Sequence, residues 1–231
     1  MLRGLRLATV LVTAAAFGLA GCTGSPAPGP TPSSTTTGTP ASTGTPVTGA
    51  GGSATATDTS EPPGDVTDAR VTYDFGVPAD TVDVTNPVSP PLPRLVGIYT
   101  GDHPQDVPAY QRISFYFQGA FPSYRFGFVS AVVQDGSGKP VTLDGTSIVS
   151  LTFVDAQAHD DAGASTVTAS PPGQLGMSHL VSYAQTGDFE GHVGIGLGLR
   201  GPDGTTKKPA IRLGQLRRGD TFVVYLDVRV N

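Results

Sequence analysis

Hydrophobic and polar residues alternate along several short stretches of the chain. This period of two is clearest in four stretches, residues 113–118, 124–128, 149–153 and 222–230. Successive side chains of a β-strand point to opposite sides of a sheet, so the period predicts strands with one face in a core. Runs rich in Gly, Asp and Pro separate the stretches. Short strands joined by polar turns predict an all-β fold, either a compact β-sandwich or an open barrel.

A glycine-rich stretch near residue 195 follows the same period. Gly194, Gly196 and Gly198 alternate with apolar residues. A dinucleotide-binding turn needs a helix directly after its glycines, and none is expected here. We therefore predict a strand with one apolar face and one bare face. Neighbouring strands or aromatic side chains would cover the bare face, or it would floor a shallow groove for a sugar or peptide.

The N-terminus is typical of an export signal. Arg3 and Arg6 precede an apolar run, Leu7–Ala20, which is short for a membrane span. The only cysteine, Cys22, follows at once, and this junction resembles the lipobox of bacterial lipoproteins. The resemblance implies cleavage before Cys22 and a lipid on its sulfur, which would hold the protein on the extracytoplasmic face of the membrane. The alternative is an ordinary signal peptide with a chance cysteine.

Composition divides the chain into four parts. After the signal peptide (1–21) comes a Ser/Thr/Pro/Gly-rich segment (22–64), predicted to be a disordered linker. Residues 65–93 form an acidic, extended lead-in, and residues 94–231 form the β-domain. Acidic and basic residues nearly balance in the β-domain, whereas a nucleic-acid surface normally shows a basic excess, so we expect no nucleic-acid partner.

Catalytic and metal-binding patterns are weak in this chain. The four histidines have no zinc-like spacing, and a solvated loop explains the densest cluster, Asp155, His159 and Asp160-Asp161. Ser178 and His179 lack the glycines of a nucleophile elbow. As neighbours in a strand they would also point to opposite faces and would not pair. We therefore predict no catalytic residues, no metal and no cofactor.

Candidate ligand contacts lie near the glycine strand. Asp188 and Glu190 are two residues apart and would share a strand face, which makes them the first candidates for polar contacts. The alternative is that Asp188 caps a turn while Phe189 fills the core. Tyr124 and Arg125 come second, as the exposed side of an aromatic strand. The predicted ligand-binding set is Asp188, Glu190, Gly194, Gly196, Gly198, Arg125 and Tyr124.

A family resemblance extends over most of the β-domain. It rests on the stretches 112–117, 122–126, 136–141, 187–191 and 221–228 together with the glycine strand. In this order they resemble the AMIN-like domain of actinobacterial lipoproteins, a relative of the AMIN domain of cell-wall amidases. The resemblance implies a β-sandwich that binds in the cell envelope, and it carries no catalytic residues.

The sequence thus predicts a lipid-anchored envelope lipoprotein. Its non-catalytic β-domain would bind cell-wall polymer, either peptidoglycan or an associated glycan. One alternative is the same anatomy with an envelope protein as the partner. Another is an envelope hydrolase that uses Asp188, Glu190 and the histidines.

Overall fold

The structure, a computed structural model of the chain, describes residues 60–230. The predicted signal peptide, the predicted lipidation site at Cys22 and most of the predicted linker lie outside these residues. The described part is built from β-strands and one short 3₁₀-helix, η1 (Pro202–Gly204). The strands are β1 (Val66–Gly76), β2 (Val82–Val84), β3 (Arg94–His103), β4 (Tyr110–Gln118), β5 (Ser123–Val129), β6 (Val132–Val133), β7 (Pro140–Val141), β8 (Ser147–Val154), β9 (Leu180–Phe189), β10 (His192–Leu199), β11 (Ile211–Arg218) and β12 (Thr221–Arg229).

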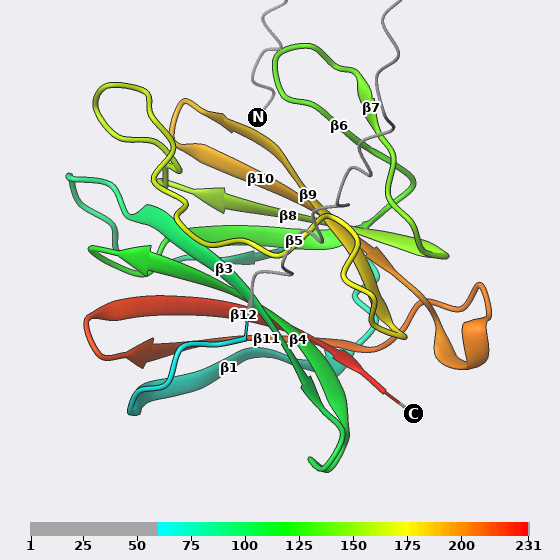
Figure 1. The fold of residues 1–231 in the computed structure, drawn as a ribbon. Coiled ribbons are helices and arrows are strands. Elements are labelled where there is room, and N and C mark those ends of the chain that lie inside the picture. Colours follow the sequence, from blue (N-terminus) through cyan, green and yellow to red (C-terminus); the bar gives the residue numbers. More distant parts are fainter. Residues whose placement is uncertain (1–59, 231) are drawn as a thin grey trace, which may run out of the picture. The chain divides into compact units, whose positions relative to one another are not determined.

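The strands form two open five-stranded sheets that pack face to face (Figure 1). Sheet A has the order β1-β11-β12-β4-β3, and sheet B has the order β2-β5-β8-β10-β9. All pairs within the two sheets are antiparallel. A third, two-stranded pair, β6 with β7, stands apart from them. The fold is therefore all-β, and the β-sandwich is confirmed over the open barrel.

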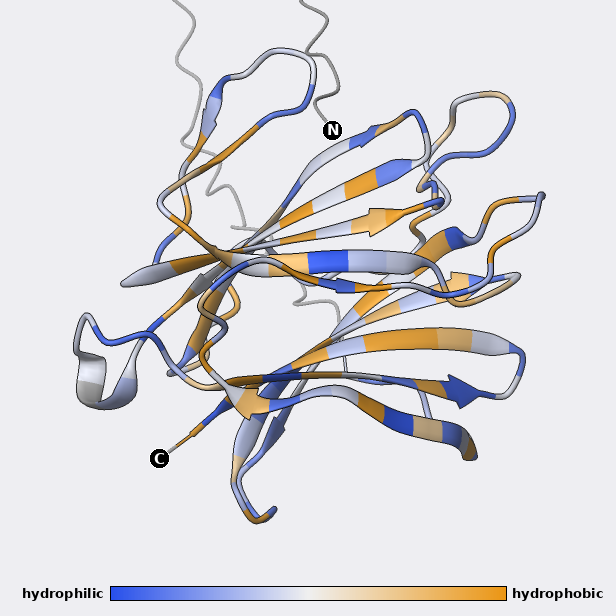
Figure 2. Cartoon of the chain, turned by 180° about the vertical axis from the view of Figure 1, so that it is seen from behind, coloured by the Kyte–Doolittle hydropathy of each residue, from blue (hydrophilic) through white to orange (hydrophobic). Residues whose placement is uncertain are grey.

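The core lies between the two sheets, where Figure 2 shows hydrophobic residues gathered. The alternating runs predict the members of this core correctly. Ile113, Phe115 and Phe117 of β4 are all buried there. Val149, Leu151 and Phe153 of β8 are buried opposite them. In β10 the apolar residues between the glycines also point into this core, namely Val193, Ile195, Leu197 and Leu199.

The predicted lead-in is an integral part of the sandwich. Within residues 65–93, β1 pairs with β11 at the edge of sheet A, and β2 pairs with β5 at the edge of sheet B. The charged and proline residues that surround these strands suit edge positions, which need protection from further pairing. Residues 60–64, which the prediction assigns to the linker, also lie on the sandwich, because Ser60 bridges to Thr100 of β3.

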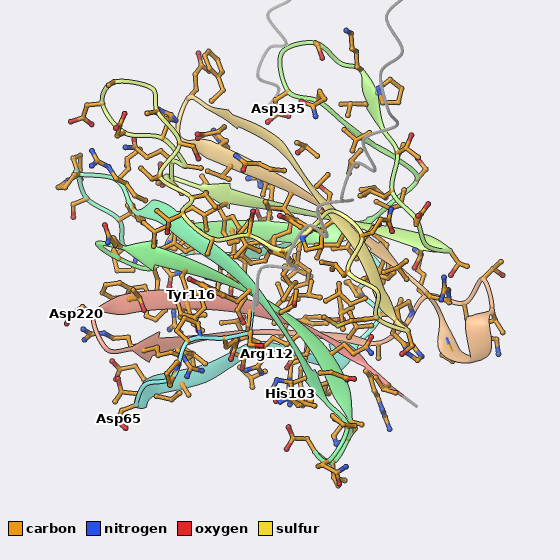
Figure 3. All side chains as sticks on the ribbon, in the orientation of Figure 1. Asp65, His103, Arg112, Tyr116, Asp135 and Asp220 are labelled. Carbon is orange, nitrogen blue, oxygen red and sulfur yellow. The ribbon has the colours of Figure 1, made fainter. Side chains whose placement is uncertain are left out.

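A buried ion pair joins three strands on the outer face of sheet A. Asp227 of β12 lies directly opposite Arg112 of β4 and Arg212 of β11. Its carboxylate is 0% exposed and accepts hydrogen bonds from both guanidinium groups at 2.6–3.0 Å. The Arg112 guanidinium also lies 3.9 Å from the centre of the Tyr225 ring. Because these residues come from adjacent strands, the cluster (Arg112 is labelled in Figure 3) fixes their register.

Neutralising Asp227 leaves the buried guanidinium group of Arg112 and the partly buried one of Arg212 without a counter-charge. We expect Asp227→Asn to lower the free energy of unfolding by about 3–5 kcal/mol, as for other buried ion pairs that lose one partner. Urea unfolding measures this. Asp83→Asn is the matched control, since Asp83 pairs with Arg125 at 3.3 Å with both side chains more than half exposed, and it should cost less than about 1 kcal/mol. Equal losses in the two variants would contradict the structural role of Asp227.

Candidate functional site

The bare face of the glycine strand is partly covered. A segment of residues 130–146, which contains β6 and β7 and is here called the covering segment, folds across the outer face of sheet B (Figure 1). A Cβ atom on Gly196 would lie 2.8 Å from Val132 and 2.9 Å from Leu143. One on Gly198 would overlap the backbone carbonyl of Asp144. Of the two alternatives, a covered face therefore holds at Gly196 and Gly198, although the covering segment fills the space instead of a neighbouring strand or an aromatic side chain.

At Gly194 a groove remains, with a volume of about 380 Å³. We call it the Gly194 groove. One wall comes from the covering segment and carries Asp135, and the floor comes from β8 and β10. The polar residues that line it are Asp135, Ser150, Thr152, Thr186 and His192. Ser150 and Thr152 lie there because their neighbours in β8, Leu151 and Phe153, point into the core.

The polar groups of the Gly194 groove are available to a ligand. Within the described residues, the side chains of Asp135, Ser150 and Thr152 form no hydrogen bond. His192 uses only Nδ1, which lies 3.0 Å from the carbonyl oxygen of Glu190. The groove thus offers hydroxyl, carboxylate and imidazole groups, a set that suits a ligand rich in hydroxyl and amide groups.

A second glycine, Gly187 of β9, leaves the space that Asp135 occupies in this wall. The Asp135 backbone N–H donates to the Thr186 carbonyl of β9 at 2.9 Å. A Cβ atom on Gly187 of β9 would overlap the Asp135 carboxylate. The glycine at position 187 therefore allows the covering segment to approach β9, and this approach forms the groove.

Asp188 and Glu190 do not come together as predicted. Asp188 accepts a hydrogen bond from the Ala158 N–H at 3.0 Å and lies 2.6 Å from Nδ1 of His159. Strand β9 ends at Phe189, and Glu190 follows in a turn with a φ of 49°. The two carboxylates thus share no strand face and do not line the Gly194 groove. Asp188 ties down the segment after β8, while Phe189, expected in the core by the alternative, is 67% exposed.

Tyr124 and Arg125 point in opposite directions. Tyr124 is only 1% exposed, and its hydroxyl lies 2.7 Å from Oγ1 of Thr72 inside the sandwich. The prediction of an exposed Tyr124 is therefore wrong, because it shares the inward face of β5 with Phe126. Arg125 is exposed as predicted, and it pairs with Asp83 on the edge strand β2.

Ser178 and His179 form a hydrogen bond, contrary to the sequence prediction. Ser178 Oγ lies 2.8 Å from His179 Nδ1. Both residues precede β9, which begins at Leu180, so the alternation of a strand does not separate them. The Gln111 side chain holds this loop by donating to Ser178 Oγ at 3.1 Å and accepting from the His179 N–H at 2.8 Å.

The acidic loop after β8 is stabilised by its own backbone. Asp160 accepts hydrogen bonds from the backbone N–H groups of Ala162 and Ala164, each at 2.9 Å, and these bonds lower its pKa. Asp161 pairs with Arg94 at 2.6 Å. Among residues 60–230 no group of three His, Cys, Asp or Glu side chains is arranged to hold a metal ion.

Sequence reasoning missed most of the Gly194 groove. Ser150 and Thr152 appear in the sequence as the polar side of a predicted strand, which is a signal for exposure but not for binding. Asp135 lies in a predicted turn, and its place over β9 depends on packing between distant segments. Of the predicted ligand-binding set, only Gly194 lines this groove.

These features define a two-sheet antiparallel β-sandwich that carries an open polar groove on one outer face. A family model described as the AMIN-like domain matches residues 93–216, more than half of the chain. The chain belongs to the AMIN-like domain family. No curated protein and no solved structure gave a significant match. In the part that the structure describes, no helix has the length and apolar character needed to cross a membrane.

A side chain at Gly198 should displace the covering segment. We expect Gly198→Ala to lower the free energy of unfolding by about 1–3 kcal/mol, the usual cost of overpacking. The new methyl group would meet the backbone of Asp144, which has little freedom to move. Gly173→Ala is the control, since its Cβ would lie 3.4 Å from the nearest atom. Chemical unfolding of both variants is the measurement, and an unchanged Gly198→Ala would contradict the packing at this position.

Buried tyrosines should make the protein lose stability at alkaline pH. Burial raises the pKa of Tyr124 from 10.0 to about 12, against the opposing hydrogen bond with Thr72. Burial likewise raises the pKa of Tyr110 to about 12. Above pH 10 the unfolded chain loses these protons while the folded chain keeps them. The free energy of unfolding therefore falls between about pH 10 and 12, by up to about 1.4 kcal/mol per pH unit for each group.

Unfolding free energies between pH 9 and 11.5 test this expectation, with phenolate absorbance recorded in parallel. The Tyr124→Phe variant lacks one of the two groups, so its free energy of unfolding should fall less steeply with pH. Ionisation of all 7 tyrosines near pH 10 in the folded protein would contradict it.

Proposed function

We propose that this chain is a lipid-anchored envelope lipoprotein whose non-catalytic β-sandwich binds cell-wall polymer in the Gly194 groove. The polymer would be peptidoglycan or an associated glycan. The AMIN domain of cell-wall amidases, a relative of this family, is associated with peptidoglycan targeting. Cys22 would carry the lipid, and the part of the predicted linker (22–64) that precedes Ser60 would separate the membrane from the sandwich.

The observation that carries the proposal is the set of unpaired polar groups around Gly194. Wall glycans present hydroxyl and acetamido groups, which need both donors and acceptors. Ser150 and Thr152 supply hydroxyls, Asp135 supplies an acceptor, and His192 supplies a ring nitrogen. Because Gly194 has no side chain, the Thr186 hydroxyl lies over its backbone and adds a further hydroxyl group to the lining. A few polar groups placed around a concave site are what fixes the orientation of such a ligand.

Co-sedimentation with purified, protein-free cell-wall sacculi tests the proposal. The full chain carries Cys22→Ser, so that no lipid contributes to retention. We expect saturable retention. Asp135→Asn with Thr152→Val should weaken it about tenfold or more, because a hydrogen bond to a charged group contributes about 1.5–3 kcal/mol.

Asp220→Asn is the matched control, because it neutralises an exposed aspartate in the β11–β12 turn, far from Asp135 (Figure 3). Its retention should equal that of the parent. Lack of saturable retention in the parent protein would overturn wall binding. Retention that survives the Asp135 and Thr152 changes would overturn the Gly194 groove as the site.

A further inference from the structure

The outer face of sheet A is crossed by residues 60–64, here called the N-terminal strap. Arg218 of β11 holds this strap at three points. Its NH1 group donates to the carbonyl oxygens of Pro62 at 2.9 Å and Gly64 at 3.3 Å. Its NH2 group donates to the Glu61 carboxylate at 3.1 Å. A single guanidinium group thus makes three of the polar contacts between the strap and the sheet.

The Glu61 carboxylate is bound as a ligand would be. One oxygen pairs with Arg218, and the other accepts a hydrogen bond from the Ser114 hydroxyl of β4. The side chains of Glu61 and Arg218 are only 15% and 16% exposed. A carboxylate that meets a guanidinium and a hydroxyl in a shielded place has the partners that carboxylate recognition commonly uses.

This site has more donors than Glu61 uses. Tyr116 lies two residues from Ser114 on β4, is 4% exposed, and its hydroxyl forms no hydrogen bond within the described residues. Burial and the charge of Glu61 both raise the pKa of Tyr116, so its hydroxyl stays protonated and able to donate. Nε of Arg218 is likewise buried without a partner. Buried donors without acceptors are rare in folded proteins and mark a place where an acceptor is missing.

A pocket of about 480 Å³ adjoins the site. Tyr116 and Arg218 belong to its lining, together with Tyr99, Val96 and the strap prolines Pro62 and Pro63. The rings of Tyr99 and Tyr116 meet edge to face, with centroids 4.7 Å apart. The pocket thus offers an apolar wall next to cationic and hydroxyl donors. That combination suits a carboxylate attached to a small apolar group, as at the C-terminal end of a peptide.

The strap is held loosely compared with the strands that follow it. Regular pairing of β1 with β11 begins only at Val66. Before that residue, the strap pairs with a strand only at the isolated bridge between Ser60 and Thr100. Segments with few backbone hydrogen bonds open at a lower free energy than the fold as a whole. The carboxylate site can therefore be vacated without unfolding the sandwich.

We propose that Ser114, Tyr116 and Arg218 form a carboxylate-binding site, which Glu61 occupies as an internal ligand until a peptide with a free C-terminal carboxylate displaces it. The site lies on the sheet opposite the Gly194 groove, so it does not depend on the proposed function. Glu61 and the peptide compete for the same donors. The peptide gains in addition the apolar pocket beside Tyr99.

Titration with N-acetyl-alanyl-alanine tests the proposal, using the full chain with Cys22→Ser and isothermal calorimetry. The same peptide with an amidated C-terminus is the ligand control. We expect the free carboxylate to bind and the amide to bind at least tenfold more weakly. Glu61→Gln removes the charge of the internal competitor and should strengthen binding about tenfold. Asp65→Asn neutralises the next acidic residue (Figure 3), which forms no ion pair in the described structure, and should leave the affinity unchanged.

The Tyr116→Phe variant distinguishes an effect on peptide binding from an effect on protein stability. Within residues 60–230 the hydroxyl meets no hydrogen-bond partner in good geometry, so its removal should change the unfolding free energy little. The affinity of the carboxylate peptide for the Glu61→Gln protein should nevertheless fall at least fivefold. Equal binding of the amidated peptide would overturn the proposal, as would no binding to Glu61→Gln at millimolar peptide. Asp135→Asn should not affect this titration, so failure here and failure of wall binding are distinguishable.

Discussion

The sandwich depends on the packing of Phe153, which meets aromatic rings from both sheets. Phe153 belongs to β8 in sheet B, and its ring centroid lies 5.1 Å from that of Phe115 and 4.8 Å from that of Phe117 in sheet A. Tyr124 of β5 lies beside it at 6.3 Å. Such edge-to-face pairs contribute about 0.5–1.5 kcal/mol each beyond the burial of their area. With Phe153 fixed inward, Thr152 and Ser150 must face outward, so the core determines which side chains line the Gly194 groove.

The outer face of each sheet has no second sheet packed against it, and the two faces are covered in different ways. Sheet B has glycine, serine and threonine there, and the covering segment packs against the glycines. Sheet A has large side chains instead, with Asp227 between two arginines and a small apolar cluster around Val223 and Tyr225. The N-terminal strap lies over this second face. Each face therefore binds a segment of its own chain and leaves a polar pocket at the margin of that segment.

The sequence predicted the strands well because their pattern is local. In β4 and β8 the alternation identifies the core residues directly, and the apolar face of β10 follows from the same rule. The edge strands β1 and β2 lie in residues 65–93, which were predicted only as an extended lead-in, because the aspartates and prolines around them are also typical of segments outside a sheet. Tyr124 was misplaced although it is two residues from Phe126, since a tyrosine suits either face of a sheet.

The binding surfaces were harder to predict because they depend on contacts between distant residues. Asp135 reaches the Gly194 groove through a hydrogen bond to Thr186, 51 positions along the chain. Glu61 reaches Arg218 across 157 positions. Neither contact leaves a periodic signal, and the glycines that permit the first one resemble those of many turns. The sequence therefore located the glycine strand correctly but not the segment that covers it.

The position of the carboxylate site means that displacing Glu61 would change where the chain is first attached to the sandwich. With Glu61 bound, the first described residue, Ser60, is held beside Thr100 on the edge strand β3. With Glu61 displaced, the first residue held by regular pairing is Val66, at the start of β1 on the opposite edge of sheet A. Six residues are then released, which is up to about 20 Å of extended chain. Displacement of Glu61 by a peptide would thus move the first held residue of the described chain from Ser60, beside β3, to Val66, at the opposite edge of sheet A.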